Sequence, residues 1–413
     1  MQKIKQNNIN LTILNYYLYL LSNRSLAFDN DLMKVNIPNK FMTLLNSRNV
    51  NEMTLESLDR FIKKMLYLEG EPENIPFKKQ KKVKYADCKL VQNGLFEEPI
   101  VDELILHIFS QMNIKKESIW PNNKVAAVCL SHDVDLFEGR SYFPLRRLWW
   151  KYQYLTSFVK GNKTRCFGLR KKMQRWSDQS YDPVCAFENW MKLEDRFGFR
   201  STFFFFGLKR GISLEGRLYS VKNPKVRETI RELDSCGWEV GLHASSFRYL
   251  DIGHLREQKE SLEDTLGKEV SGCRQHLLRF VLPNSWAAYS EVGFKYSSNV
   301  GFGGGVNGFR AGTCIPYYPI TPGGILEVPF QLMDSAGIAD VGKYFKMFIN
   351  YKNKVKKVGG CLVMNFHQEY FDEIEAPGTN SVYRMILENL SEDDELWVAP
   401  LREVCLHLWE RQK

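Results

Sequence analysis

From residue 124 onward, short apolar runs alternate with stretches in which apolar and polar residues recur at helical spacing. Short apolar runs bounded by turn residues are typical of buried strands, and the stretches between them are typical of amphipathic helices. Helices are predicted at 225–236 and 254–266, each followed by a glycine. The predicted strands are 125–130, 201–206, 238–242, 270–273, 294–297, 325–328 and 361–366. This α/β alternation predicts a parallel sheet, and seven such units favour a distorted (β/α)7 barrel over an open sheet.

The first part of the chain has a different pattern. Helical periodicity is clear over 55–68, which carries Lys63 and Lys64 near its end, and no strand-helix alternation precedes residue 124. A chain of 413 residues is long enough to divide into two domains. We therefore predict a small N-terminal domain of unknown role over 1–120 and the barrel over 121–413.

Two further observations suggest an environment for the chain. The apolar stretch 11–21 is interrupted by Asn15, is too short to span a bilayer and precedes no small-residue cleavage site, so a cytoplasmic location is expected. The 9 cysteines are scattered and form no Cys-x-x-Cys pair, which predicts reduced and mostly buried thiols.

Polar residues capable of chemistry follow the predicted strands. The first strand runs into Ser131-His132-Asp133-Val134-Asp135, and side-chain alternation places Asp133 and Asp135 on one face. Two ionised carboxylates so close together repel each other when buried, so they require a cation beside them. The alternative is a structural pair of turn aspartates.

Histidines recur at other strand ends. His243 ends the third strand, His276 follows Arg274-Gln275 after the fourth, and His367 follows the last. A single histidine at such a place is usually structural, but the chain has only 7 histidines and three of them fall here. Carboxylate and imidazole ligands suit zinc or a similar divalent ion that serves hydrolysis.

Two other catalytic patterns are absent from the sequence. The run Gly301-Phe302-Gly303-Gly304-Gly305 lacks the Gly-Lys-Ser/Thr of a phosphate loop, so we expect a flexible loop that lines the barrel mouth. There is also no Gly-x-Ser-x-Gly motif, which argues against a serine esterase.

In these motifs, from about Val125 to His367, the sequence resembles the polysaccharide deacetylases of carbohydrate esterase family 4, which share the NodB-homology barrel. The resemblance implies that Asp133 is the catalytic base and that Arg274 pairs with it. It also implies that Asp135 and His243 are metal ligands and that His367 is the general acid.

The sequence departs from the family pattern in ways that indicate a divergent bacterial subgroup. Phe247 occupies the position of the second ligand histidine, and Gln275-His276 follow Arg274 where a proline and an aromatic residue are usual. The aspartate that orients the catalytic histidine is missing from 296–299, and Asp334 is a candidate to replace it.

A metal site needs a further ligand beyond Asp135 and His243, because catalytic zinc sites commonly use three protein ligands and water. We predict His276 for this role. His132 is the competing candidate, but on a regular strand its side chain points away from Asp133 and Asp135.

The resemblance implies metal-dependent hydrolysis of an N-acetyl group on an amino sugar of a glycan or glycan precursor. Two alternatives stay open: a pseudoenzyme that binds glycan without cleaving it, favoured by Phe247, and an amidohydrolase that acts on a small non-sugar amide. Metal content and turnover separate the first alternative from the enzyme, and the shape of a bound ligand separates the second.

The net charge of +9 is concentrated in a basic aromatic insertion at about 140–176, which has many Lys and Arg residues but no Asp or Glu. It includes Trp149, Trp150, Tyr152, Tyr154 and Trp176. A solvated basic helix, contact with an anionic membrane surface that carries a lipid-linked glycan, and nucleic-acid binding are the three interpretations. No nucleic-acid motif supports the last, so no nucleic-acid partner is expected.

Overall fold

The structure is a computed structural model of the 413-residue chain. It describes residues 13–22, 34–38, 41, 44, 52–69, 71, 85, 88–139, 146–178, 182–208, 219–319, 324–334 and 338–411. Residues 140–145 of the predicted basic insertion therefore lie outside the described residues.

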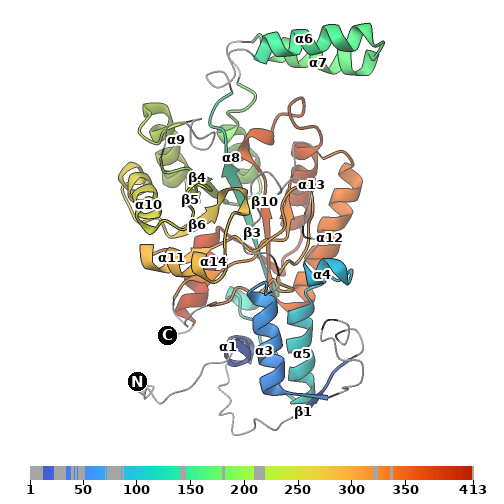
Figure 1. The fold of residues 1–413 in the computed structure, drawn as a ribbon, viewed down its shortest axis with the longest axis vertical. Helices are drawn as coiled ribbons and strands as arrows, with labels where there is room; N and C mark the ends of the chain where they lie inside the picture. Colours follow the sequence, from blue (N-terminus) through green and yellow to red (C-terminus); the bar gives the residue numbers. More distant parts are fainter. Residues whose placement is uncertain are drawn as a thin grey trace.

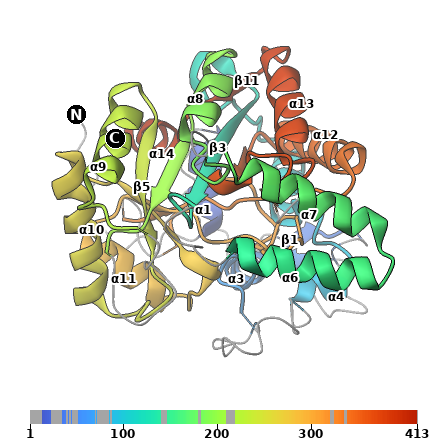
Figure 2. The same cartoon turned by 90° about the horizontal axis from the view of Figure 1, so that it is seen from above.

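A curled parallel sheet forms the centre of the molecule (Figures 1 and 2). Its strand order is β8-β7-β6-β5-β4-β3-β10-β9, and β11 pairs in parallel with the first residues of β3. The strands are β3 (Ala126–Val134), β4 (Thr202–Phe205), β5 (Glu239–Ala244), β6 (Gly272–Gln275), β7 (Tyr296–Ser297), β8 (Leu326–Glu327), β9 (Leu332–Met333), β10 (Cys361–Asn365) and β11 (Leu396–Val398). Each of the seven predicted strands overlaps an observed one, and the predicted fold class is confirmed.

One segment of the chain supplies both edge strands of this sheet, β8 and β9. β8 pairs with β7, β9 pairs with β10, and only residues 328–331 separate β8 from β9. Within that connection, Phe330 N–H donates to the carbonyl of Val300 at 3.1 Å and Gln331 N–H donates to the carbonyl of Val363 at 3.0 Å. The two edges therefore meet in the same segment, which gives the sheet its distorted barrel shape.

The strands continue further than the apolar runs suggested. The pairing of β3 with β4 covers Ser131–Val134, so Asp133 lies inside β3 rather than beyond its end. β5 likewise includes His243, and β6 includes Arg274. The strands continue because backbone pairing does not depend on whether a side chain is apolar. At these strand ends the inward side chains are polar, and they form hydrogen bonds with one another.

Helices surround the barrel, as the view from above shows (Figure 2). At α10, Asp251 accepts a hydrogen bond from the backbone N–H of His254, and the helix ends at Gly267 with φ of 82°. The helices around the barrel are α8 (Phe187–Asp195), α9 (Pro224–Ser235), α10 (Ile252–Leu266), α11 (Asn284–Val292), α12 (Val341–Val358), α13 (Thr379–Ser391) and α14 (Leu401–Glu410). Short 3-10 turns are η1 (Pro121–Asn123), η2 (His276–Leu278) and η3 (Gln368–Tyr370).

The N-terminal elements pack below the barrel in the view of Figure 1. They are α1 (Ile13–Ser22), β1 (Lys34–Asn36), β2 (Glu52–Thr54), α3 (Leu55–Leu66), α4 (Lys89–Gln92) and α5 (Ile100–Gln111). Tyr16 Oη donates to the carbonyl of Pro316 at 2.8 Å, and Asp102 accepts hydrogen bonds from Thr313 and Cys314. Buried side chains of this region and of the barrel form one continuous cluster, and the boundary at residue 120 stays a prediction.

The predicted basic insertion forms two antiparallel helices, α6 (Arg146–Val159) and α7 (Lys163–Arg175), which project from the end of the barrel opposite α1, α3 and α5 (Figure 1). All nine cysteines are free and most are buried, as predicted.

Candidate metal centre

Three side chains converge where β3, β5 and β6 end. Asp135 follows β3, His243 lies in β5 and His276 follows β6. His243 Nε2 is 3.1 Å and His276 Nε2 is 3.6 Å from Asp135 Oδ1. One ligand atom from each residue lies within 4.8 Å of the others, so the three residues form a group that fits a divalent metal ion.

The hydrogen bonding of His243 supports a cation at this place. Its Nδ1 lies 3.1 Å from the backbone carbonyl oxygen of Arg274, which accepts only from a protonated nitrogen. Nε2 of the neutral ring then presents a lone pair to a carboxylate oxygen of Asp135. Among the described residues, neither Asp135 Oδ1 nor His243 Nε2 has a hydrogen-bond partner, although both atoms are buried. Two acceptors that face each other are stabilised by a cation held between them.

Asp133 lies beside this group but has other partners. Arg274 Nη1 is 3.1 Å from its Oδ1, and Asn365 Nδ2 donates to its Oδ2 at 2.8 Å. Burial favours the neutral carboxylic acid, but nearby positive charge, which includes that of the Arg274 guanidinium, outweighs it and lowers the pKa of Asp133. This carboxylate is therefore ionised at neutral pH, and two polar side chains fix its orientation.

Arg274 is fully buried, and its guanidinium forms hydrogen bonds with several polar groups and packs against two aromatic rings. Besides Asp133, it donates to Ser131 Oγ at 2.8 Å and to Asn365 Oδ1 at 2.9 Å, and it bonds both the carbonyl and the hydroxyl of Ser298. The rings of Phe204 and Phe330 lie 4.5 Å and 5.3 Å from its Cζ. The sequence resemblance implied only the contact with Asp133.

The glycine-rich run 301–305 serves this packing. A Cβ atom on Gly301 would approach the ring of Phe330 to 2.4 Å, and Phe330 packs on Arg274. Phe302 is buried, and the N–H of Gly303 donates to Tyr85 Oη at 2.7 Å. The expectation that this run merely lines the barrel mouth was therefore wrong at its start, where space for an aromatic ring requires a residue without a side chain.

His367 follows β10 and is paired with Asp334, which follows β9. His367 Nδ1 lies 2.6 Å from Asp334 Oδ1, and its backbone N–H donates to Oδ2 of the same carboxylate at 2.9 Å. Burial opposes the charged imidazole, but the carboxylate of Asp334 outweighs it and raises the pKa of His367 well above its usual value. Nε2 of His367 faces Asp135 Oδ2 at 3.9 Å. Asp334 therefore contacts His367 through both of its carboxylate oxygens, and its role in place of an aspartate at 296–299 stays a prediction.

His132 lies outside this group. Its ring is fully buried on the other face of β3, where Nδ1 contacts the carbonyl of Phe366 at 2.8 Å and Nε2 contacts Glu194 at 2.7 Å. Trp238 and Tyr383 donate to the same carboxylate, so His132 belongs to a network between the sheet and its helices. Phe247 is half-exposed, and the structure places His276 rather than a residue near Phe247 beside Asp135 and His243.

Three residues near the group were not singled out from the sequence. Asn365 bridges Asp133 and Arg274, and Ser298 binds Arg274, but an Asn and a Ser near strand ends give no signal of their own. Glu369 is buried two residues after His367, and burial together with the charge of Asp135 raises its pKa well above the usual value.

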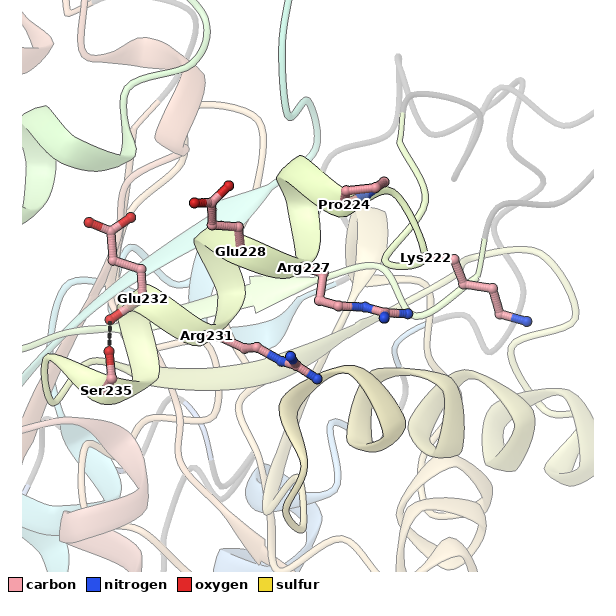
Figure 3. A pocket seen from close by; sticks show the side chains of 7 residues that line it. All are labelled: Lys222, Pro224, Arg227, Glu228, Arg231, Glu232 and Ser235. Carbon is pink, nitrogen blue, oxygen red and sulfur yellow. Dashed lines mark hydrogen bonds between the residues drawn. The ribbon is translucent and has the colours of Figure 1, made fainter.

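A separate hollow lies along α9 (Figure 3). It is lined by Lys222, Pro224, Arg227, Glu228, Arg231, Glu232 and Ser235, all of them exposed. Its alternating charges are typical of a solvated helix surface, and none of the candidate site residues lines it.

No family model and no curated protein matches the chain. Solved structures do resemble it. A Mycobacterium smegmatis protein described as a polysaccharide deacetylase is 20% identical and matches 71% of this chain and 93% of its own, with a TM-score of 0.48. A Pseudomonas aeruginosa protein with the same description is 14% identical over 74% of this chain and 97% of its own, with a TM-score of 0.47. A family 4 acetyl xylan esterase from Clostridium thermocellum, in complex with cobalt, is 11% identical over 67% and 89%, with a TM-score of 0.34. Two of these structures are described as polysaccharide deacetylases and one as a family 4 esterase, and the likeness concerns the fold alone.

Proposed function

We propose that this chain is a metal-dependent hydrolase that removes the acetyl group from an N-acetylated amino sugar of a glycan or glycan precursor. The observation that carries the proposal is the grouping of three ligand-type side chains between a carboxylate with a lowered pKa and an imidazole with a raised pKa. Amide hydrolysis needs a base that accepts a proton from water and an acid that protonates the leaving amine.

Asp135, His243 and His276 would hold the ion, which we propose is zinc. When bound, such an ion polarises a carbonyl and lowers the pKa of water from about 15.7 to about 7. Two imidazoles and one carboxylate are a ligand set that suits catalytic zinc and leaves a position open. The carbonyl of Arg274 fixes the tautomer and ring orientation of His243.

Asp133 is the proposed base. Its carboxylate oxygen Oδ2 lies 4.0 Å from His243 Nε2, which places it next to the ligand group without belonging to it. Arg274 and Asn365 hold the carboxylate in one orientation. Because its pKa is lowered, Asp133 is ready to accept a proton from water at neutral pH.

His367 is the proposed general acid. Asp334 holds the proton on Nδ1 and stabilises the imidazolium, so Nε2 carries the proton that the departing amine receives. Nε2 lies 3.9 Å from Asp135 Oδ2, whereas Asp133 Oδ2 lies 4.0 Å from His243 Nε2, so the acid and the base lie next to different members of the ligand group.

The direct test combines elemental analysis of the purified protein with acetate release from a panel of N-acetylated sugars. We expect about one divalent ion per chain and release of acetate that stops when a chelator removes the ion. Metal without turnover on any sugar would favour the glycan-binding pseudoenzyme. Turnover only on small non-sugar amides would favour the other amidohydrolase.

The metal ligands can be tested without any substrate. His276→Ala is expected to lower metal affinity by about 10-fold to 100-fold or more, because it removes one of three ligands. His132→Ala should retain the metal, since its ring lies on the opposite face of β3 in contact with Glu194. Metal content measured after dialysis checks both, with His107→Ala, at a partly exposed histidine of α5 outside the ligand group, as the control. Metal loss in His132→Ala together with metal retention in His276→Ala would reverse the assignment.

The pH profile tests the pairing of His367 with Asp334. Since activity needs the protonated imidazole, kcat should fall as pH rises through the raised pKa of His367. Asp334→Asn removes the anion that raises this pKa, so the basic limb of the profile should move to lower pH by about one unit or more. Asp340→Asn is the control, because asparagine also caps α12. An unmoved basic limb in Asp334→Asn would show that another group supplies the proton.

A further inference from the structure

The two projecting helices, α6 and α7, carry an apolar stripe that faces away from the rest of the chain. We call these helices the arm. Leu148, Tyr152, Leu155 and Val159 recur at spacings of four, three and four residues, which places them on one face of α6. Their exposed fractions are 61%, 59%, 61% and 86%. Trp149 extends the stripe and stacks on Tyr152 with ring centroids 5.8 Å apart.

The opposite face of α6 already provides the packing that holds the arm together. Trp150 is buried in a cluster with Leu169 and Trp176, and its ring centroid lies 5.5 Å from that of Trp176. The stripe is therefore not needed to join the two helices. Large apolar side chains exposed on one face of a helix mark a surface that meets another apolar phase.

The positive charge of the arm limits which partner the apolar stripe can contact. The chain from Arg140 to Trp176 has no Asp or Glu, and Lys151, Lys160, Lys163, Arg165, Arg170 and Lys171 are all exposed on the arm. A second copy of the arm would bring like charges together, which disfavours self-association through the stripe. Nucleic acid would satisfy the charge but offers little to the aliphatic side chains of Leu148, Leu155 and Val159. An anionic bilayer satisfies both, because acyl chains accept the stripe and lipid phosphates attract the cations.

The base of the arm is tied to the rim of the candidate site. Arg175 Nε lies 3.3 Å from Asp372, Trp176 Nε1 donates to Glu375 at 2.7 Å, and Lys172 Nζ lies 3.6 Å from Glu375. Both acidic residues belong to the segment that follows His367. Figure 1 shows the arm at the end of the barrel where β3 leads out of the sheet. A surface held by the arm is therefore close to the side of the molecule that carries the candidate metal centre.

We propose that the arm docks the protein on an anionic lipid bilayer, with the stripe of α6 inserted at the level of the headgroups and the barrel mouth turned toward the membrane. Among the described residues, no helix is long and apolar enough to cross a bilayer, so docking of this kind is peripheral. A further consequence, which rests on the proposed function, is that the acetylated amino sugar is presented at the membrane surface.

Vesicle co-sedimentation of the full chain tests the docking without substrate or metal. Vesicles of phosphatidylcholine mixed with phosphatidylglycerol should bind the protein, and raising the salt from about 0.1 M to about 1 M should weaken the binding, because the screening length falls from about 10 Å to about 3 Å. The triple variant Leu148→Ser/Leu155→Ser/Val159→Ser should bind at least about tenfold more weakly. Lys151→Gln/Lys171→Gln should also lose about tenfold or more, since each charge near an anionic surface contributes about 1 kcal/mol. Leu406→Ser, which removes an exposed leucine on α14, is the matched control and should bind like the unmodified protein.

Circular dichroism and thermal unfolding show whether the triple variant is folded. Equal binding to pure phosphatidylcholine, or no binding to either vesicle, would overturn the proposal. A dimer in light scattering that the triple variant breaks would assign the stripe to a second copy instead. Oligonucleotide binding stronger than vesicle binding would show that the Lys and Arg side chains of the arm bind nucleic acid rather than lipid. None of these readings depends on turnover, so failure of the docking and failure of the deacetylase proposal are distinguishable.

Discussion

Asp133→Asn should lower kcat by about 10²-fold to 10⁴-fold while the metal content stays unchanged. The size is that expected when a positioned base is removed from a proton-transfer step. Metal is retained because Asp133 is held by Arg274 and Asn365 rather than by the ligand group. Asparagine has the same shape and can still accept from Arg274, so the variant tests basicity rather than packing.

The measurements are steady-state acetate release and elemental analysis of the same preparations. Asp135→Asn is the contrasting variant, because it removes a proposed ligand and should lose metal and activity together. Asp251→Asn, which keeps the cap of α10, controls for a changed aspartate on the surface and should retain full activity. If Asp133→Asn kept more than about a tenth of the original kcat, Asp133 would not be the catalytic base.

Arg274→Met should cost about 3–5 kcal/mol of unfolding free energy. The guanidinium is buried and pairs with a buried carboxylate, so its removal leaves Asp133 ionised without its main partner in a dry environment. Ser131, Asn365 and Ser298 would also lose a hydrogen-bond partner.

Urea denaturation of Arg274→Met, Asp133→Asn and the double variant measures the coupling between the two residues. We expect the double variant to be less destabilised than the sum of the single ones, because a neutral Asn at 133 no longer needs a cation. Arg60→Met, at an exposed ion pair on α3, is the control and should change stability by less than about 0.5 kcal/mol. Strict additivity would mean that packing on Phe204 and Phe330, rather than charge, determines the loss.

The strand pattern and much of the candidate site could be predicted from the sequence. Buried parallel strands are nearly continuous apolar runs, so their positions were legible, and period-two alternation correctly separated Asp133 and Asp135 from His132. The need for a third ligand led to His276, which lies beside Asp135 in the structure. The catalytic and ligand roles themselves stay predictions.

Other features had no local signal. β8 and β9 contain two residues each, too few for any periodic pattern, so the segment that supplies both edges of the sheet was seen only as one strand. Asn365 matters because it lies between two residues from distant parts of the chain, and only the register of β10 against β3 places it there. The pairing of Asp334 with His367 likewise follows from the neighbouring positions of β9 and β10.

The order in which the barrel strands leave the ribosome differs from the order in which they pair. β3 is the first barrel strand to be synthesised, yet its neighbours include β10 and β11, the last two. Asp133 meets Arg274 across 141 positions of sequence and Asn365 across 232. A nascent chain that has not yet exposed β10 therefore leaves one edge of β3 open and Asp133 without its partner Asn365, which makes folding dependent on contacts of long sequence separation. By contrast, the proposed ligands Asp135, His243 and His276 are all synthesised before β10, so the ligand group can assemble before the contact of Asp133 with Asn365 completes the fold.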